Sequence, residues 1–382
     1  MLRFLTAGES HGPCLTAIVD GLPAGLPLDL TAINKDLQRR QAGYGRGARM
    51  SIERDTVQAE GGLACGKTTG GPLALRIENL DWPNWENKPL PTLSVPRPGH
   101  ADLAGELKYH LGNLQLVLER SSARETAARV AVGSVAKSLL MHFGTCVGSH
   151  VTEIGGVSAS VAPESVPEMW TLAEQSPVRC PDRAASIQMC QRIDQARLEG
   201  DSLGGAFIVT ALGVPPGLGS YVQWDRRLDG LLAGALVSIP GVKGVEIGPA
   251  FQNARLPGSQ VHDAIVPGNP LPARTSNRAG GTEGGVTNGQ PLVVRAAMKP
   301  IPTLLKGLPS VDLATGKASP AVYQRSDVCA VPAAAVVGEA MVAWILAGAL
   351  IEKLGGDSLD EMQSRWQQWM STLILPWPSQ GD

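Results

Sequence analysis

The sequence lacks the features that mark secreted, metal-binding or membrane-anchored proteins. Its six cysteines are scattered, with no C-x-x-C pair and no zinc-like spacing: Cys14, Cys65, Cys146, Cys180, Cys190 and Cys329. In a chain of 382 residues this pattern is typical of reduced thiols in a cytosolic protein. The N-terminal residues also lack the charged and apolar regions of a signal peptide. We therefore expect a cytoplasmic protein that holds no metal.

Net charge and aromatic side chains are also scarce. The formal net charge is -2, so nothing attracts the whole molecule to nucleic acid or to a membrane, and any anion must bind at a local cluster. The 43% hydrophobic and 18% charged residues are ordinary for a globular protein. With only 4% aromatics, the 45 glycines and 29 prolines indicate tight turns and close backbone approaches.

One long apolar run, residues 330–351, contains a single charge, Glu339. Its length alone would make it a candidate membrane helix. However, Pro332 suits the first turn of a helix, Gly355 and Gly356 suit its end, and small residues dominate the run. We therefore predict a buried helix, with a membrane span as the alternative.

The stretch from residue 97 to residue 132 carries the densest pattern. Arg97-Pro98-Gly99-His100 predicts a turn that presents His100, with Asp102 beside it. Further on, Ser122 followed three residues later by Glu125 is typical of a capping box, in which each side chain binds a backbone N–H at a helix start. Apolar residues then recur at helical spacing and predict a buried face: Ala128, Val132, Val135 and Leu139.

A helix that begins near Ser122 predicts an anion site. Its unpaired N–H groups and partial positive charge attract an anion, and Arg120 and Arg124 would add full charges beside them. A plain helix cap that binds nothing is the alternative. The nearby turn with His100 favours the site.

Two glycine-rich segments nearer the N-terminus carry further candidates. Residues 8–12 lie between two expected strands, 2–5 and 17–20, and their glycines predict either a projecting His11 or a plain turn. After an expected helix at 30–40, five arginines occur within sixteen residues: Arg39, Arg40, Arg46, Arg49 and Arg54. Arginine forks can converge on a small polyanion, although a solvated loop has the same composition. Nucleic acid is poorly supported, because Tyr44 is the only aromatic side chain nearby.

Three patterns in the second half are ambiguous. Residues 276–285 pair glycines around Glu283 and predict either an anion-binding nest or a flexible hairpin. The segment 299–303 ends an expected strand at 292–297, and its two prolines stiffen the backbone that presents Lys299 and Thr303. Asp327, just ahead of the apolar run, either belongs to a site or caps that helix.

An internal echo bears on the fold. Residues 66–76 resemble residues 285–295, with 200–209 as a looser third copy, and each is a glycine-rich turn that leads into an apolar strand. The repetition suggests two similar halves that pack against each other. Composition shows no linker between them, so we expect one domain spanning residues 1–382, of the α/β (α+β) class with sheets and helices in layers.

Taken together, these motifs resemble the chorismate synthase family. The resemblance covers nearly the whole chain, in family order, at residues 8–12, 39–49, 97–102, 120–131, 277–289, 299–303 and 325–332. It implies a layered β-α-β sandwich and a homotetramer. It also implies a carbon–oxygen lyase that converts 5-enolpyruvylshikimate 3-phosphate to chorismate and phosphate by an anti-1,4-elimination. The family requires reduced FMN, although nothing is oxidised overall.

The resemblance assigns catalytic and flavin-binding roles to residues of this chain. His11 would protonate the leaving phosphate, His100 would stabilise the anionic reduced flavin, and Asp327 would assist proton removal at flavin N5. The FMN site would comprise Arg120, Ser121, Ser122, Pro240, Gly241, Gly284, Lys299, Pro300, Ile301, Pro302, Thr303 and Arg325. Many relatives carry a polar residue and alanine in place of Pro240-Gly241, so we do not expect a side-chain amide contact to FMN here, whereas backbone contacts could survive. The segment 82–96 is also shorter than in many relatives, which predicts a more open lid.

Substrate binding is assigned in the same way to Arg40, Arg46 and Arg49, with NADP near the first two. No reductase domain is visible, so we expect NADPH to act indirectly, through an external flavin reductase. Two alternatives use the same fold. One is an NADPH-dependent flavin reductase that uses these arginines, and the other is a flavin-binding protein without catalysis.

Overall fold

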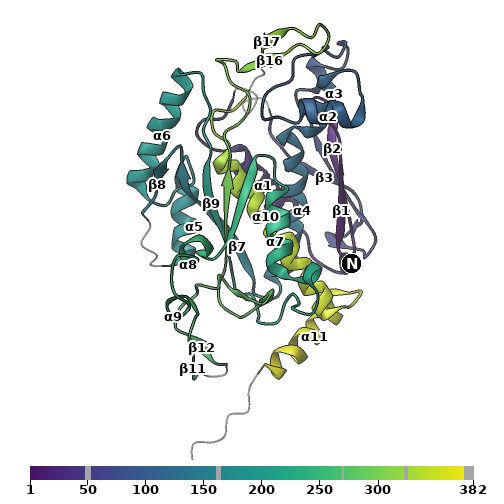
Figure 1. Ribbon diagram of the computed structural model, residues 1–382. Helices are drawn as coiled ribbons and strands as arrows, with labels where there is room; N and C mark the ends of the chain where they lie inside the picture. Colours follow the sequence, from purple (N-terminus) through teal and green to yellow (C-terminus); the bar gives the residue numbers. More distant parts are fainter. Residues whose placement is uncertain (48–52, 161–164, 269–270, 322–325, 374–382) are drawn as a thin grey trace, which may run out of the picture.

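The computed structural model describes residues 1–47, 53–160, 165–268, 271–321 and 326–373, and its first sheet comes from the first half of the chain (Figure 1). This antiparallel sheet has the order β1-β2-β6-β3. Its strands and the two helices that follow its hairpins are β1 (Arg3–Ala7), β2 (Cys14–Asp20), α1 (Leu30–Gln41), β3 (Val57–Gly61), β6 (Leu73–Glu78) and α4 (Thr126–Met141). The strands and helix expected in residues 2–41 are confirmed.

The second half forms a five-stranded sheet in the order β10-β15-β9-β7-β8. Its elements are β7 (Cys146–Ile154), β8 (Val157–Ser158), β9 (Gly205–Leu212), α7 (Leu228–Val237), β10 (Val242–Ile247), β15 (Leu292–Met298) and α10 (Val331–Leu354). When β8 and the other elements inserted between these are left aside, the order strand, strand, helix, strand, strand, helix occurs twice, and β1-β2-β6-β3 corresponds to β7-β9-β15-β10. The internal pseudo-symmetry suggested by the sequence echo is confirmed.

Two threonines of the echoed segments make the same contacts in each half. The hydroxyl of Thr68 donates to the carbonyl of Pro23 at 2.6 Å and accepts the backbone N–H of Leu26 at 2.9 Å. The hydroxyl of Thr287 donates to Pro215 at 2.6 Å and accepts from Leu218 at 2.8 Å. The echo therefore reflects one local structure that occurs twice in the chain.

Helices fill the space between the two sheets. α4 contacts β2 and β6, while α10 contacts β7, β9 and α4. Their backbones approach closely, since a Cβ placed on Gly133 would lie 2.3 Å from the Cβ of Ala340. The predicted apolar face of α4 is buried here, as are Phe207 and Val209 of the second sheet. The expected layered β-α-β sandwich is confirmed.

The long apolar run forms α10, whose composition would allow it to cross a membrane. However, 78% of its most apolar window is buried inside the protein. Pro332 lies in its first turn, and Gly355 ends it with φ 61°. The prediction of a buried core helix is confirmed.

The remaining elements lie around this framework. They are β4 (Leu63–Ala64), β5 (Lys67–Thr68), η2 (Trp82–Asn84), α2 (Asp102–Tyr109), α3 (Leu114–Ser121), η3 (Ala123–Glu125), α5 (Val166–Gln175), α6 (Arg183–Leu198), η4 (Trp224–Arg226), α8 (Ala250–Asn253), α9 (Gly258–Val261), β11 (Ile265–Val266), β12 (Ala273–Arg274), β13 (Thr282–Glu283), β14 (Val286–Thr287), β16 (Pro309–Val311), β17 (Ala318–Pro320) and α11 (Leu359–Thr372). α2 and α3 pack together beyond one end of the first sheet (Figure 1).

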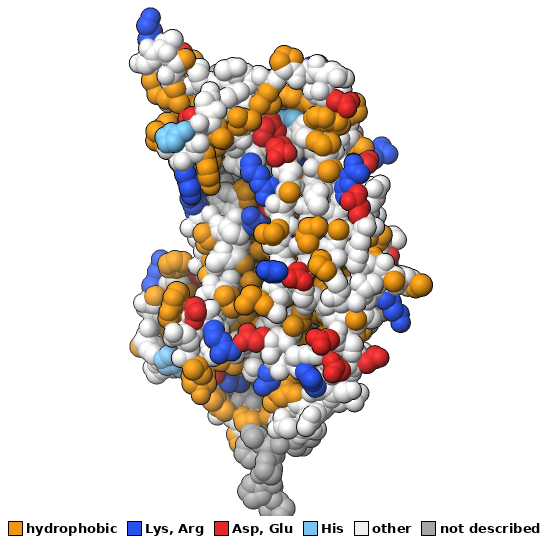
Figure 2. Space-filling view, turned by 90° about the vertical axis from the view of Figure 1, so that its right-hand side faces the viewer, with side chains coloured by type: hydrophobic (Ala, Val, Ile, Leu, Met, Phe, Trp, Pro, Cys, Tyr) orange, Lys and Arg blue, Asp and Glu red, His pale blue; other side chains and the backbone are white. Residues whose placement is uncertain are grey.

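The outer face of the first sheet is open to solvent and mixed in character (Figure 2). Leu5 is 75% exposed and Ile18 is 39% exposed. Between such side chains lie ion pairs, among them Arg3 with Asp20 at 2.9 Å. Apolar side chains of the sheet's other face, such as Val19, Leu73 and Ile77, are buried in the core.

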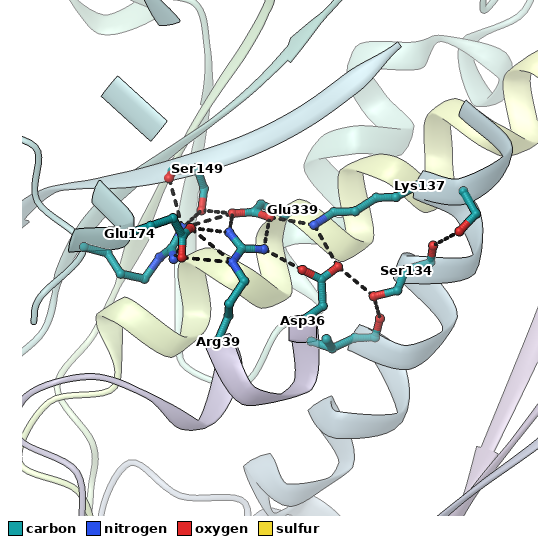
Figure 3. Close-up of polar contacts among 10 residues, drawn as sticks. Asp36, Arg39, Ser134, Lys137, Ser149, Glu174 and Glu339 are labelled. Atoms are coloured by element: carbon teal, nitrogen blue, oxygen red, sulfur yellow. Dashed lines mark hydrogen bonds and ion pairs between the residues drawn. The ribbon is translucent and has the colours of Figure 1, made fainter. Parts of the chain in front are cut away.

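A buried ion network joins α1, α4 and α10 (Figure 3). Glu339 of α10 is fully buried, and its carboxylate binds Arg39 through two hydrogen bonds of 2.7 and 2.8 Å. Lys137 and Arg179 also bind it, at 2.7 and 3.1 Å. Arg39 is therefore not among the arginines that could converge on a small polyanion, because its guanidinium is directed into this network.

Candidate active site

The candidate site is built around residues 119–126, which we call the α3–α4 junction. α3 ends at Ser121, Ser122 is extended with φ -63° and ψ 141°, and a 3-10 turn leads into α4. The Ser122 hydroxyl caps this turn by accepting the N–H of Arg124 at 3.3 Å. The predicted contact of the Glu125 carboxylate with a backbone N–H, the second half of the capping box, is wrong. This carboxylate instead binds side chains of β1 and α4.

His11 lies against this junction, in the loop between β1 and β2. Its Nδ1 is 2.7 Å from a carboxylate oxygen of Glu119, and its ring stacks on Trp85 with centroids 4.0 Å apart. His11 therefore does not project from its loop but is held on two sides. Although the segment 82–96 is short, it still covers His11 through Trp85.

Arg120 and Ser122 hold the loop that carries His11. The Arg120 guanidinium donates to the backbone carbonyls of Thr6 and Gly8 at 2.8 and 3.1 Å. The Ser122 hydroxyl donates to that of Ser10 at 3.2 Å. Arg120 thus uses much of its hydrogen-bonding capacity on the protein itself.

A cavity of about 550 Å³ lies beside the junction. Its lining includes Arg120, Ser121 and Ser122 of the junction, and also Ser238 and Pro240. The Ser121 hydroxyl is buried and has no hydrogen-bond partner among the described residues. A buried hydroxyl without a partner is costly, so this cavity suits a ligand that offers it a polar atom.

The segment 299–303 follows β15 and reaches the same region through Gly241. The backbone N–H of Lys299 donates to the carbonyl of Gly241 at 2.9 Å, next to Pro240 of the cavity. The Lys299 ammonium binds the carbonyl of Gly99, just before His100. Burial, and then the nearby charge of Lys243, lower the pKa of Lys299 below its ordinary value. Lys299 therefore connects the cavity to the turn that carries His100.

The other residues of this segment point in different directions. Thr303 accepts a hydrogen bond from Arg97 at 3.0 Å, and the carbonyl of Ile301 accepts one from Ser202 at 2.6 Å. Pro302 lies beside Gly99. Pro300 lines a separate cavity on the second sheet. The predicted flavin contacts of residues 299–303 therefore divide between two surfaces.

His100 sits in the predicted turn and is paired with Asp102. Its Nδ1 lies 2.5 Å from one Asp102 oxygen, while Arg97 binds both oxygens at 2.8 and 3.0 Å. Burial alone would raise the pKa of Asp102, but hydrogen bonds from His100 and Arg97 and the Arg97 charge hold it well below its usual range. Asp102 is therefore ionised at neutral pH and orients the imidazole.

Arg40 reaches the junction from inside the protein. It donates to the Thr126 hydroxyl at 2.9 Å and to the Ala123 carbonyl at 3.0 Å, and it pairs with Asp55 at 3.3 Å. Burial, together with the charges of neighbouring arginines, lowers the pKa of Arg40 to about 10 despite Asp55. Arg124 is equally buried, 2.6 Å from Asp55, so it is not the exposed anion ligand that the sequence predicted.

Asp327 lies next to Arg46 and does not cap α10. Its carboxylate accepts Nη1 of Arg46 and the backbone N–H of Gly47, both at 2.6 Å. α10 begins without a side-chain cap. Of the two interpretations of Asp327, the structure excludes the helix cap. The predictions for Arg49 and Arg325 lie outside the described residues.

Gly284 is far from the other predicted flavin residues of the same chain. It lies in the β13–β14 hairpin, where the neighbouring Gly285 accepts the N–H of Leu228 at the start of α7. Ser238, at the other end of this ten-residue helix, lines the cavity. The helix is about 15 Å long. The hairpin also lies before the start of β15, whereas Lys299 lies directly after its end. The length of this strand, about 20 Å, therefore separates the two. Residues 282–287 thus form a hairpin, while the predicted anion-binding nest stays a prediction.

Sequence reasoning missed Glu119 and Trp85, both of which touch His11. Glu119 immediately precedes the motif at residues 120–131, but it contacts His11, which lies 108 positions earlier in the chain. No local pattern reports such a contact. The only local signal was the position of Glu119 immediately before the arginine that opens the motif at residues 120–131.

Comparisons with known proteins agree on one family. The family model described as chorismate synthase matches residues 2–351. Chorismate synthase from Desulforamulus reducens is 56% identical over 384 residues, covering 97% of this chain and 99% of the relative. Those from Syntrophotalea carbinolica and Moorella thermoacetica are 54% and 56% identical over 377 and 376 residues, each covering 96% of this chain and 97% of the relative.

A solved structure gives the same result. A crystal structure of chorismate synthase superposes with a TM-score of 0.81 at 45% identity, covering 97% of this chain and 98% of the other. The likeness therefore extends over both sheets and the helices between them.

Proposed function

The chain belongs to the chorismate synthase family, and we propose that it eliminates phosphate from 5-enolpyruvylshikimate 3-phosphate to give chorismate, with reduced FMN. One observation carries this proposal. His11, Arg40, Ser121 and Ser122, from segments far apart in the chain, meet at the α3–α4 junction, beside a cavity with an unpaired buried hydroxyl.

The residues present fit a flavin. The Ser121 hydroxyl is buried without a hydrogen-bond partner among the described residues, and Lys299 and Arg120 supply positive charge near the same region. Arg120, Ser121, Ser122, Pro240, Gly241 and residues 299–303 would hold reduced FMN, together with Arg325. When bound, the reduced flavin supplies electron density to the allylic system of the substrate.

The substrate would be bound by Arg46 and Arg49, with Arg40 supporting them from inside. Arg46 is paired with Asp327 at 2.6 Å, so an anionic substrate would compete for its guanidinium. That competition would leave Asp327 available to help remove the proton near the flavin. His11 would give a proton to the leaving phosphate oxygen, and His100 would place its positive charge near the reduced flavin.

We also propose that the protein works as a homotetramer with an external flavin reductase. Gly284 lies at the opposite end of both α7 and β15 from the cavity, so its predicted flavin contact requires a second copy of the chain. NADPH would serve the external reductase and thus act indirectly.

Anaerobic assays with reduced FMN test this function. We expect turnover of 5-enolpyruvylshikimate 3-phosphate by the wild type and a fall in kcat of roughly 10²–10⁴ for His11→Ala, because a positioned proton donor contributes about that much. For His100→Ala we expect a fall in kcat of roughly 10²–10³, because electrostatic stabilisation by one group contributes about that much. Full turnover by either variant would remove that histidine's role. NADPH oxidation with free FMN and no added reductase would contradict the dependence on an external supply.

A further inference from the structure

The buried carboxylate of Glu119 binds His11 twice. One oxygen lies 2.7 Å from Nδ1 of the ring, and the other accepts the backbone N–H of His11 at 2.7 Å. Gln115, one turn earlier on α3, donates its amide N–H to the first oxygen at 2.6 Å. Both oxygens of Glu119 therefore lie within hydrogen-bonding distance of N–H groups, an arrangement that suits an ionised carboxylate.

Several physical effects keep Glu119 ionised. Burial would raise its pKa, but hydrogen bonds from the side chain and backbone of His11, and from Gln115, hold the pKa below its ordinary value. Because the carboxylate has no proton to give, Nδ1 of His11 must be the donor. The other ring nitrogen, Nε2, is then the one that gains and loses a proton.

Trp85 fixes the plane of the same ring. Its indole stacks on the imidazole at an interplanar angle of 30°, and its N–H donates to Asp81 at 3.2 Å. A ring that is bonded at Nδ1 and covered on one face has little freedom to turn over. The direction of Nε2 is therefore set before any substrate binds.

We propose that Glu119 is a positioning residue for His11: it holds the proton on Nδ1, so that the protonated ring gives its Nε2 proton to the leaving phosphate and becomes the neutral Nδ1–H tautomer. This inference rests on the proposed function. As the carbon–oxygen bond breaks, the Nε2 proton passes to the phosphate oxygen and the imidazole keeps its Nδ1–H. Glu119 exchanges no proton, and solvent restores the one lost from Nε2.

A double-mutant cycle tests this role. In Glu119→Gln the side-chain amide has one acceptor oxygen, whereas the ring and the backbone N–H of His11 need two. The variant side chain therefore no longer fixes the His11 ring. We expect kcat to fall about 10–10²-fold, as for other residues that orient a functional histidine, with KM changed less than about threefold. Glu119→Asp keeps the charge and should recover part of the loss. In the His11→Ala background, Glu119→Gln should have no further effect on kcat.

Glu106→Gln is the matched control. Glu106 lies in the neighbouring α2, and its carboxylate accepts the backbone N–H of Gly112 at 2.9 Å instead of a histidine. Its kcat should equal that of the wild type. An unchanged kcat in Glu119→Gln, or an equal loss in the His11→Ala background, would show that Glu119 has only a structural role and would overturn the inference.

Nitrogen NMR of protein labelled with ¹⁵N-histidine separates this inference from the proposed function. His11→Ala identifies the His11 signals among the six histidines. We expect Nδ1–H in the neutral ring of the wild type and a shift toward Nε2–H in Glu119→Gln. An active wild type with the Nε2–H tautomer would overturn this inference alone. An inactive wild type with the Nδ1–H tautomer would overturn the function and leave Glu119 as a structural clamp.

Discussion

At the scale of single residues, the α3–α4 junction combines paired buried charges with one unpaired hydroxyl. Arg40 and Arg124 are 4% and 5% exposed, and both bind Asp55. Ser121 has no such partner among the described residues. A buried polar atom without a partner costs about 1–3 kcal/mol. Ser121 is therefore the residue whose energetics a bound ligand would change most.

Ser121→Ala should weaken binding of reduced FMN about 3–10-fold, the equivalent of one ordinary hydrogen bond. The free energy of unfolding without flavin should not fall, because no protein hydrogen bond is lost. Anaerobic flavin titration and urea unfolding measure the two effects. Ser138→Ala on α4, whose hydroxyl binds the Ser134 carbonyl, is the control. An unchanged flavin affinity would remove Ser121 from the site.

His150 predicts a dependence of stability on pH. Burial and the charge of Arg179 lower its pKa to about 4, below the ordinary value of 6.5. On acidification the unfolded chain therefore takes up the proton first, so stability is complete above about pH 6.5 and falls toward pH 4. Between pH 7.5 and 5 the loss should be about 2 kcal/mol.

Urea unfolding of the wild type and of His150→Gln at both pH values measures this loss. The variant should lose less stability on acidification, and His262→Gln, at an exposed position, is the control. Equal losses in the wild type and in His150→Gln would contradict the expectation.

At the scale of elements, the end of α1 is held on two sides. Arg39 binds Glu339 of α10, whereas Arg40 binds Asp55 and the junction. Consecutive residues on a helix point about 100° apart, so neighbouring arginines reach different partners. The ion network in Figure 3 therefore anchors the helix that carries Arg40, without touching the site itself.

Glu339→Gln should destabilise the protein by about 3–5 kcal/mol, because it leaves buried cations without their carboxylate. Burial would raise the pKa of Glu339, but the charges of Lys137 and Arg39 lower it well below its usual range. Its contribution is therefore present above the ordinary carboxyl pKa and is lost only when the pH falls further. Urea unfolding at pH 7 and pH 5 should show the same difference from the wild type.

Glu352→Gln is the control on the same helix. Glu352 is 62% exposed and pairs with Arg226, so solvent screens the pair and stability should hardly change. If Glu339→Gln were no more destabilising than Glu352→Gln, the network would contribute nothing to the core.

At the scale of the whole molecule, the two pseudo-symmetric halves are interlocked. α4 of the first half packs on α10 of the second, and Ala24 forms a bridge with Ser358, beyond α10. We propose that residues 1–382 fold as one domain. The candidate site depends on this interlocking, since its segments come from both halves.

Residues 1–145 expressed alone should fail to fold, because the apolar face of α4 would lose α10. Circular dichroism and denaturant unfolding measure this, and we expect no cooperative transition from the fragment but one from the full chain. Co-expression of residues 1–145 with residues 146–382 should restore a folded complex. A cooperative transition in the isolated fragment would show two domains.

The sequence by itself determined the local structure and the family. Periodic apolar residues specify α4 and α10, and the repeated glycine-rich turns revealed two similar halves, because these features depend on near neighbours in the chain. The ordered motifs identified the family in the same way.

Only the tertiary structure decided which side chains meet. In the structure Arg39 binds Glu339 instead of the partners of Arg40, and Glu125 binds Thr6 instead of a backbone N–H. Gly284 and Lys299 lie at opposite ends of β15. The tertiary structure also joined Glu119 to His11 across 108 positions. Such contacts depend on how distant elements pack, and the spacing of residues along the chain carries no record of that packing.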